Sequence, residues 1–208
     1  MIAIVDYGMG NVRSVQKAFE RLGHDAEITS DPVRVRRAAG VVLPGVGAFG
    51  DCMRNLTTGM LRDPVVDVIK SGTPFLGICL GLQLLFTESE EFGRQEGLGI
   101  VPGRVRRFPS TAPSGETLKV PHIGWNQVTW RNRAGIFDDL PDGSHLYFVH
   151  SYYVEPEDPT WIAGSSEYGL PFTAAIARDN LWGVQFHPEK SQALGLAVLT
   201  RFGKLCHD

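Results

Sequence analysis

Short apolar strands alternate with helical segments through residues 1–87, and this alternation restricts the fold more than any other feature of the sequence. The strand-like runs are continuous and apolar, as at residues 2–6, whereas the segments between them carry apolar residues at helical spacing, as at residues 12–22. Strands that are connected through helices form parallel sheets with helices on both faces. The expected strands are residues 2–6, 26–28, 41–43 and 75–78, and the expected helices are residues 12–22, 32–39 and 49–61, a segment capped by Asp63-Pro64, and residues 80–87.

The pattern changes beyond residue 95, where glycine, proline and short strands replace the helices. We expect these strands to extend the same sheet in an antiparallel manner, with residues 104–115 as the most loop-like segment. The expected strands are residues 101–108, 120–130, 146–154, 162–168, 172–177 and 182–186, and the expected final helix is residues 191–205. The predicted fold class is therefore α/β, with a mostly parallel central sheet flanked by helices and an antiparallel extension.

Length and composition favour a single domain, residues 1–208, because this length suffices for one sizeable core and would be cramped for two. With 43% hydrophobic residues, 21% charged residues and a net charge of −3, the chain has no electrostatic case for binding nucleic acid or an anionic membrane. The first strand follows no basic leader, and no apolar run approaches the ~20 residues of a membrane span, so we expect a cytoplasmic location. The three cysteines form no Cys-x-x-Cys pair, which argues against a disulfide framework or a structural zinc site and fits a reducing compartment.

The stretch Gly77-Ile78-Cys79-Leu80-Gly81 places a cysteine where a predicted strand turns into a predicted helix. This matches the Gly-x-nucleophile-x-Gly elbow, in which glycines permit close backbone approach and the nucleophile projects at the carboxyl edge of the sheet. The backbone N–H of Leu80 would then be free to face a developing oxyanion. The alternative is a small buried thiol in the core, which is the commoner role of a free cysteine.

A nucleophilic cysteine needs a base, and the base needs an orienting group. His187 ends a predicted strand, and Pro188 keeps the chain extended before Glu189. Residues two apart in an extended chain point the same way, so Glu189 can reach one imidazole nitrogen while the other faces away. The alternative is a surface turn with an accidental pair.

The turn Pro44-Gly45-Val46-Gly47 follows another predicted strand at the same edge of the sheet. Its glycines allow backbone N–H groups to point into a site, which would supply the second donor of an oxyanion hole. A turn without a catalytic role needs the same glycines. This motif is therefore consistent with a catalytic site but does not distinguish it from an ordinary turn.

Taken together, residues 77–83 and 187–189 resemble the class I, triad-type glutamine amidotransferases, whose fold is flavodoxin-like. Further segments resemble one branch of this family, whose members supply ammonia to a (β/α)8 barrel cyclase in histidine biosynthesis. These segments are residues 6–11, 43–49, 121–126, 147–152 and 185–191, and they extend from end to end of the chain. Residues 106–119 match no pattern of the family, and no role is predicted for them.

The resemblance implies that the chain hydrolyses glutamine to glutamate and ammonia through a cysteinyl thioester, with no metal and no cofactor. In this scheme Cys79 is the nucleophile, His187 moves the proton, and Glu189 orients His187. The implied oxyanion donors are Leu80, Val46 and Gly47, and the implied glutamine-binding residues are Gly45, Gln83, Glu91, Ser151 and Tyr152. If the resemblance to the family is set aside, the plainer interpretation of Gln83 is a solvent-facing helical residue, and that of Glu91 is a member of an acidic run.

Free ammonia would escape and be protonated, so a productive enzyme needs a joined acceptor site. The chain has no phosphate-binding Gly-x-x-x-x-Gly-Lys loop, which places the synthase on another chain. The resemblance implies a heterodimer with the barrel cyclase, yielding imidazole glycerol phosphate and aminoimidazole-carboxamide ribonucleotide, and a glutaminase that stays slow until the cyclase binds its ligand. The implied interface residues are Asn11, Trp125, Tyr147 and Lys190, for which helix capping, core packing and a solvated charge are the plainer roles.

Three other functions remain open from the residues. The chain could serve another ammonia-channelling synthase, such as pyridoxal phosphate synthase. It could be a cysteine hydrolase or peptidase that acts alone, or a regulatory binding subunit whose thiol is structural.

Overall fold

The computed structural model describes residues 1–131, 133 and 135–206. The predicted domain, residues 1–208, includes positions 132, 134, 207 and 208, which lie outside the described residues. The strands are β1 (Ile2–Val5), β2 (Ala26–Thr29), β3 (Gly40–Gly45), β4 (Phe75–Cys79), β5 (Phe86–Ser89), β6 (Gln95–Glu96), β7 (Val101–Arg107), β8 (His122–Trp130), β9 (Ser144–His150), β10 (Tyr152–Pro156), β11 (Ile162–Glu167), β12 (Pro171–Arg178) and β13 (Leu181–Val184). The helices are α1 (Val12–Arg21), α2 (Pro32–Arg37), α3 (Phe49–Thr58), α4 (Arg62–Lys70), α5 (Leu80–Gln83) and α6 (Gln192–Leu205), with short 3-10 turns η1 (Gly135–Phe137), η2 (Pro159–Trp161) and η3 (Pro188–Lys190).

The strands of the described residues form one sheet, whose main path runs in the order β2-β1-β3-β4-β13-β12-β10-β7-β5-β6. Its first five strands pair in parallel, and β12, β10 and β7 follow with antiparallel pairing. A branch of antiparallel strands, β11, β8 and β9, leaves the path at β12. The predicted α/β class with an antiparallel extension is therefore confirmed.

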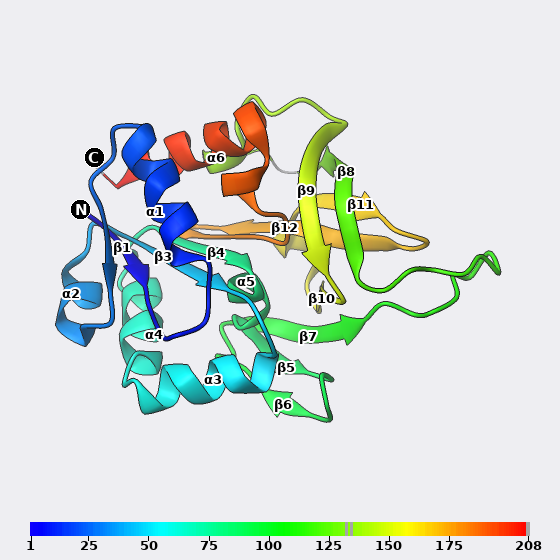
Figure 1. Ribbon diagram of the computed structural model, residues 1–208, viewed down its shortest axis with the longest axis horizontal. Helices are drawn as coiled ribbons and strands as arrows, with labels where there is room; N and C mark the ends of the chain where they lie inside the picture. The colour runs from blue at the N-terminus through cyan, green and yellow to red at the C-terminus, as the bar shows by residue number, and fades with distance from the viewer. Residues whose placement is uncertain (132, 134, 207–208) are drawn as a thin grey trace.

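Helices cover both faces of the parallel strands, with α1 and α6 on one face and α2, α3 and α4 on the other (Figure 1). The side chains of β1 alternate between these two layers. Ile2 and Ile4 belong to the apolar cluster under α1 and α6, which includes Phe19 and Phe202, whereas Val5 belongs to the cluster on the opposite face. Because both faces of the sheet are covered, its central strands are continuous apolar runs, as the sequence suggested.

One predicted helix is much shorter in the structure. Residues 80–87 were expected to be helical, but α5 ends at Gln83 and Phe86 already belongs to β5. Phe86 is fully buried where it pairs with Val101 of β7. An apolar run of this length fits a buried strand as well as a buried helix, and the available strand partner decides between them.

The second half differs from expectation in three places. Residues 146–154 were expected to be one strand, but the chain bends at Ser151, since β9 pairs with β8 and β10 pairs with β7. Arg104 was expected both in the strand at 101–108 and in the loop-like segment at 104–115, and the structure supports the strand, since Arg104 lies within β7 and pairs with Glu155 of β10. The expected strand at 182–186 is β13, and it joins the parallel part of the sheet beside β4 instead of the antiparallel extension. None of these pairings is encoded in local periodicity.

No helix among the described residues has the length and apolar character needed to cross a membrane.

The elbow between β4 and α5 packs directly on the backbone of β3. A Cβ atom added to Gly81 would overlap the carbonyl oxygen of Leu43, and one added to Gly77 would lie 2.9 Å from the carbonyl oxygen of Gly81. Backbone atoms of a buried strand cannot move aside as a flexible side chain can. Glycine at position 81 is therefore required for α5 to close against the sheet.

Gly81→Ala should lower the free energy of unfolding by about 3 kcal/mol, because the added methyl group overpacks a rigid backbone contact. Urea unfolding followed by circular dichroism would measure this loss. Gly50→Ala is the matched control: Gly50 lies in α3, and its added Cβ would meet only the mobile end of Gln95, at 2.9 Å. The control should stay within about 1 kcal/mol of the wild type, and equal stability of both variants would contradict the packing argument.

Candidate active site

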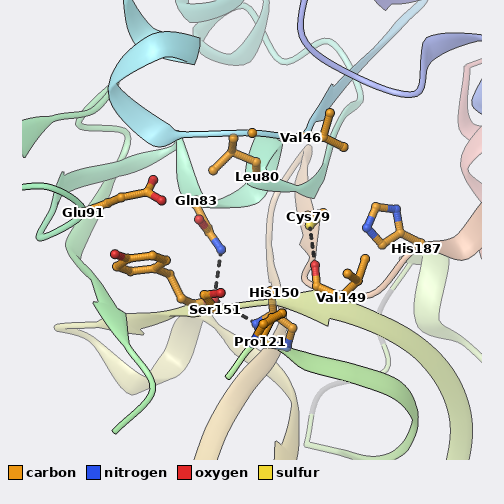
Figure 2. Close-up of a pocket in the computed structure, with 12 residues that line it drawn as sticks. Val46, Cys79, Leu80, Gln83, Glu91, Pro121, Val149, His150, Ser151 and His187 are labelled. Carbon is orange, nitrogen blue, oxygen red and sulfur yellow. Dashed lines mark hydrogen bonds between the residues drawn. The ribbon is translucent and has the colours of Figure 1, made fainter. Parts of the chain in front are cut away.

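Cys79 ends β4 with a backbone conformation that is unusual for a residue with a side chain, φ 55° and ψ −110°. Its neighbour across the sheet is Gly45 of β3. The strained turn aims the thiol into a cavity of about 320 Å³ at the carboxyl edge of the sheet (Figure 2). The cavity is lined by Val46, Gly47, Cys79, Leu80, Gln83, Glu91, Pro121, Val149, His150, Ser151, Tyr152 and His187.

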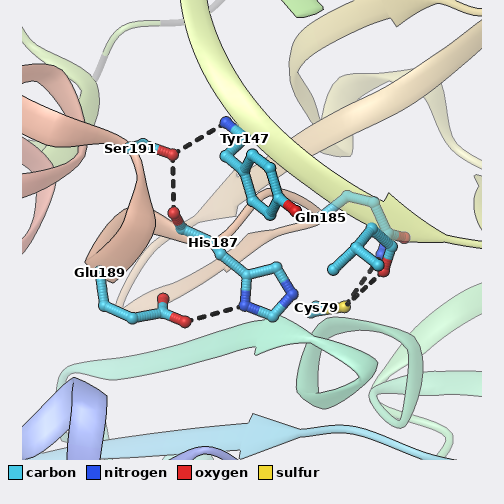
Figure 3. Close-up of polar contacts among 7 residues, drawn as sticks. Cys79, Tyr147, Gln185, His187, Glu189 and Ser191 are labelled. Atoms are coloured by element: carbon cyan, nitrogen blue, oxygen red, sulfur yellow. Dashed lines mark hydrogen bonds and ion pairs between the residues drawn. The ribbon is translucent and has the colours of Figure 1, made fainter. Parts of the chain in front are cut away.

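His187 reaches this cavity from the neighbouring strand, just after β13. Its Nδ1 lies 2.9 Å from Oε1 of Glu189, and the two side chains are only 3% and 1% exposed. Since a carboxylate accepts, Nδ1 carries the proton. The other nitrogen, Nε2, is buried, has no hydrogen-bond partner among the described residues and is turned toward Cys79 (Figure 3). The structure thus brings together Cys79, His187 and Glu189, the three residues that the sequence analysis grouped.

The electrostatics of His187 favour its charged form. Burial lowers the pKa of His187, but the nearby Cys79 sulfur and the Glu189 carboxylate raise it by more, and the balance raises the pKa to about 10. An imidazolium beside the sulfur stabilises a thiolate, which is the nucleophilic form of cysteine.

Two further groups contact the Cys79 sulfur, and sequence analysis identified neither. The side-chain amide of Gln185 donates to Sγ at 3.7 Å, and the carbonyl oxygen of Val149 lies 3.9 Å from it (Figure 3). Gln185 is completely buried. Its signal in the sequence was a polar residue inside the apolar run at 182–186, since a buried amide has to be hydrogen-bonded.

The backbone donors expected for an oxyanion hole lie at the cavity wall. Leu80 is the first residue of α5, so its N–H has no partner within the helix. Val46 and Gly47 line the cavity from the β3 side. Gly45 does not line the cavity. It lies in β3, where an added Cβ would contact Leu80 and Tyr7.

Two buried side chains hold the turn after β3. The hydroxyl of Tyr7 donates to the carbonyl oxygen of Pro44 at 2.8 Å, and the thiol of Cys52 lies 3.6 Å from the carbonyl oxygen of Val46. Burial raises the pKa of Cys52 to about 11 and that of Tyr7 well above its usual value, so both groups keep the proton that they donate. The Cys52 thiol and the Tyr7 hydroxyl therefore hold the backbone on the two sides of Gly45, and the Cys52 contact restricts the orientation of the peptide that follows Val46.

Four of the five residues expected to bind glutamine, all but Gly45, line the cavity, and Figure 2 shows Gln83, Glu91 and Ser151 at the end away from His187. Gln83 is buried, and its amide nitrogen donates to the carbonyl oxygen of Tyr152 at 3.0 Å and to the side chain of Gln185 at 3.1 Å. The solvent-facing alternative for Gln83 is thus wrong. One carboxylate oxygen of Glu91 accepts from the backbone N–H of Phe49 at 2.6 Å. Neither the amide oxygen of Gln83 nor the second carboxylate oxygen of Glu91 takes part in these bonds, and both residues line the cavity.

Three of the four expected interface residues form one group at the surface. The rings of Trp125 and Tyr147 are 5.9 Å apart, and the ammonium of Lys190 lies 5.9 Å from the centre of the Tyr147 ring. Trp125 is 46% exposed, which argues against a role in core packing. Asn11 occupies the N-cap position of α1, where its side chain makes no capping hydrogen bond within the described part of the chain.

A cysteine on a strand-to-helix elbow, with a histidine and a glutamate in the segment that follows the adjacent parallel strand, is the arrangement of a triad-type cysteine enzyme that attacks a carbonyl carbon. The family model that matches the chain is "Glutamine amidotransferase class-I", over residues 3–203. The chain therefore belongs to the class I glutamine amidotransferase family, as its motifs suggested.

Similar proteins narrow this assignment. The imidazole glycerol phosphate synthase subunit HisH of Syntrophotalea carbinolica is 58% identical over 99% of this chain and 100% of its own. The HisH subunit of Geobacter metallireducens is 55% identical over 97% of this chain and 96% of its own. Among solved structures, the one described as "Crystal structure of glutamine amidotransferase" aligns with a TM-score of 0.75 at 16% identity over 100% of both chains. PurLQS from Thermotoga maritima aligns with a TM-score of 0.74 at 17% identity, over 97% of this chain and 96% of that chain. These last two likenesses concern the fold alone.

The raised pKa of His187 predicts a pH dependence of stability. A group whose pKa is higher in the folded state stabilises the protein fully below its unfolded pKa, about 6.5, and this contribution is lost as the pH rises toward about 10. The free energy of unfolding of the wild type, minus that of His187→Asn, should therefore be largest near pH 6 and decline by a few kcal/mol on the way to pH 10. Urea unfolding of both proteins across this range measures the difference. A difference that is constant with pH would contradict the ion pair.

Proposed function

We propose that this chain is the glutaminase subunit of an imidazole glycerol phosphate synthase. It hydrolyses glutamine to glutamate and ammonia, and it delivers the ammonia to a (β/α)8 barrel cyclase in the cytoplasm. The observation that carries the proposal is the unpartnered Nε2 of His187, which is turned toward Cys79 at the cavity while Glu189 holds Nδ1 of the same ring. The chain is covered almost completely by relatives that are named as subunits of this synthase.

The chemistry follows from the positions of these groups. The Cys79 sulfur attacks the side-chain amide carbon of glutamine, while His187 holds the proton of the thiol. The negative oxygen of the tetrahedral intermediate rests on backbone N–H groups of Leu80 and of the turn at Val46 and Gly47. His187 then gives its proton to the amide nitrogen, the carbon–nitrogen bond breaks, and ammonia leaves. Water attacks the remaining thioester with His187 as base, which releases glutamate and restores the thiol.

Glutamine recognition is assigned to the other end of the cavity. The free carboxylate oxygen of Glu91 suits the α-ammonium group of the substrate, and the amide oxygen of Gln83 is a second acceptor beside it. The backbone at Ser151 and Tyr152 is assigned to the α-carboxylate. This placement supports the predicted roles because it leaves the amide end of glutamine next to Cys79.

The barrel cyclase is assigned to the surface formed by Trp125, Tyr147 and Lys190, with Asn11 as a further contact. Ile123, which is 60% exposed, adds to the apolar character of β8 on this side. Aromatic residues, such as the exposed Trp125 and the partly exposed Tyr147, are enriched at the centres of protein interfaces. The surface is also close to the catalytic base, because the backbone N–H of His187 donates to the carbonyl oxygen of Tyr147 at 2.9 Å.

The alternatives rest on weaker support. If the chain served pyridoxal phosphate synthesis, we would expect its similar proteins to be named as subunits of that synthase. The similar proteins at 48–58% identity are instead named as subunits of imidazole glycerol phosphate synthase. A hydrolase that acts alone would turn over peptides or esters without the cyclase. A purely regulatory subunit would show a thiol of ordinary reactivity.

Cys79→Ala should abolish glutamine-dependent synthesis by the complex, by about a thousandfold or more, because no other group can form the thioester. Synthesis from added ammonium should be unchanged, since the cyclase makes the product from ammonia. Product formation from each nitrogen source, with the purified complex, measures both activities. Cys206→Ala, which removes a buried thiol in the segment after α6, is the matched control and should retain glutamine-dependent synthesis. Loss of both activities in Cys79→Ala would assign Cys79 to folding or docking.

Lys190→Glu should weaken the binding of the cyclase at least tenfold, which corresponds to about 1.4 kcal/mol, because it removes the cation beside Tyr147 and reverses the charge. Isothermal titration calorimetry of the two purified subunits measures the dissociation constant. Lys204→Glu makes the same charge change on an exposed residue of α6 and should bind as the wild type does. Equal affinities of the two variants would move the interface away from Lys190.

A further inference from the structure

Two buried imidazoles, His122 of β8 and His150 of β9, lie beside the glutamine cavity without a role in the chemistry described above. They pair across the two strands, with Nδ1 of His122 3.0 Å from Nε2 of His150. Nδ1 of His150 lies 2.8 Å from the carbonyl oxygen of Tyr152. At the other end, the amide nitrogen of Asn126 lies 3.4 Å from Nε2 of His122. These contacts form a continuous hydrogen-bonded chain from β8 to the wall of the cavity.

The direction of every bond in this chain is determined by its two ends. A carbonyl oxygen only accepts, so Nδ1 of His150 must carry the proton. Nε2 of a neutral His150 must then accept, and Nδ1 of His122 must donate to it. This leaves Nε2 of His122 as the acceptor for the Asn126 amide, which also donates to the carbonyl oxygen of Glu167 at 2.7 Å. Each imidazole is therefore held in one tautomer.

Their surroundings require both imidazoles to be neutral. His122 and His150 are only 4% and 6% exposed. The ring of His122 stacks on Tyr168 at 4.2 Å, and the ring of His150 lies 5.2 Å from Phe108. Burial lowers the pKa of His122 to about 4 and that of His150 to about 3. The chain of bonds is thus intact at neutral pH.

The carbonyl oxygen of Tyr152 is the point where this chain meets the active site. It accepts from His150 on one side and from Gln83 on the other (Figure 2). Gln83 in turn donates to Gln185, whose amide donates to the Cys79 sulfur. The position of one peptide group at the cavity wall therefore depends on His150, and the orientation of Gln83 depends on that peptide.

We propose that His122 and His150 are positioning residues for glutamine: they fix the Tyr152 carbonyl so that Gln83 and the backbone at Ser151 and Tyr152 keep their substrate-binding geometry. This inference rests on the proposed glutaminase function and deepens it. Neither imidazole touches the reacting atoms. Their effect falls on substrate binding and leaves the attack by Cys79 unchanged.

His150→Phe keeps an aromatic ring among aromatic neighbours and removes the donor to the Tyr152 carbonyl. In the complex with the cyclase and its ligand, the KM for glutamine should rise about tenfold, whereas kcat should stay within about threefold, as expected when one hydrogen bond that positions the binding site is lost. His150→Asn returns an N–H donor near the position of Nδ1, and it should recover most of the lost affinity. Initial rates of glutamate release over a range of glutamine concentrations give both constants.

His145→Phe is the matched control, since His145 is exposed on the same strand and its Nε2 lies 2.9 Å from the side-chain amide nitrogen of Gln127, away from the cavity. Its KM should equal that of the wild type. His122→Phe should raise the KM about threefold, because His150 then loses the donor that holds its tautomer. This second variant keeps the test decisive if His150→Phe does not fold.

An unchanged KM in folded His150→Phe or His122→Phe would overturn the inference. So would a fall in kcat alone, or a defect in His150→Phe that His150→Asn does not reduce. A wild-type complex that releases no glutamate would instead overturn the proposed function, so the two failures are distinguishable.

Discussion

The parallel pairing of β4 with β13 is the contact on which the active site depends. Ile78 pairs with Val184, so the two strands end at the same edge of the sheet, and the residues that follow them are Cys79 and the segment that contains His187. The nucleophile and its base are therefore brought together by strand register. Only two residues separate the end of β13 from His187, and groups held close to rigid strands are positioned more precisely than groups on long loops.

Two glycines allow the helix α5 to pack against the paired strands β4 and β13. Gly77 and Gly183 face each other across β4 and β13. A Cβ atom on Gly183 would lie 2.5 Å from a methyl carbon of Leu82, and one on Gly77 would lie 2.9 Å from the backbone of Gly81. The short helix α5 can settle on the sheet only because both positions lack side chains. The same packing sets the sharp turn at Cys79, whose strained conformation is held by the surrounding contacts.

Sequence analysis succeeded where the signal was local. The parallel half of the sheet follows from the alternation of strands and helices, and the elbow at Cys79 follows from two glycines at fixed offsets. The pairing of His187 with Glu189 was also predicted, but through a different backbone geometry: an extended chain was expected, whereas Pro188–Lys190 form the 3-10 turn η3, which still brings the Glu189 carboxylate to Nδ1 of His187. Each of these inferences needs only a few neighbouring residues.

Apart from the start of α4, which begins at Arg62 and not after an Asp63 cap, the failures concern partners that are distant in the sequence. The periodicity of β13 is that of any apolar strand, and nothing in it distinguishes a parallel neighbour from an antiparallel one. The break at Ser151 arises because the strands on its two sides pair with different partners, and the end of α5 arises because β5 finds a place beside β7. Gln185 and His150 were overlooked as site residues for the same reason: their hydrogen bonds cross from one strand or helix to another.

The proposed docking surface and the catalytic base share one set of hydrogen bonds. The backbone N–H of Tyr147 donates to the hydroxyl of Ser191 at 2.9 Å, and this hydroxyl donates to the carbonyl oxygen of His187 at 2.6 Å (Figure 3). The backbone N–H of His187 closes the loop by donating to the carbonyl oxygen of Tyr147. The Ser191 side chain is buried, so these bonds are shielded from competing water. A displacement of β9 at Tyr147 consequently displaces the backbone of His187 with it, and the base cannot be positioned independently of the surface assigned to the cyclase.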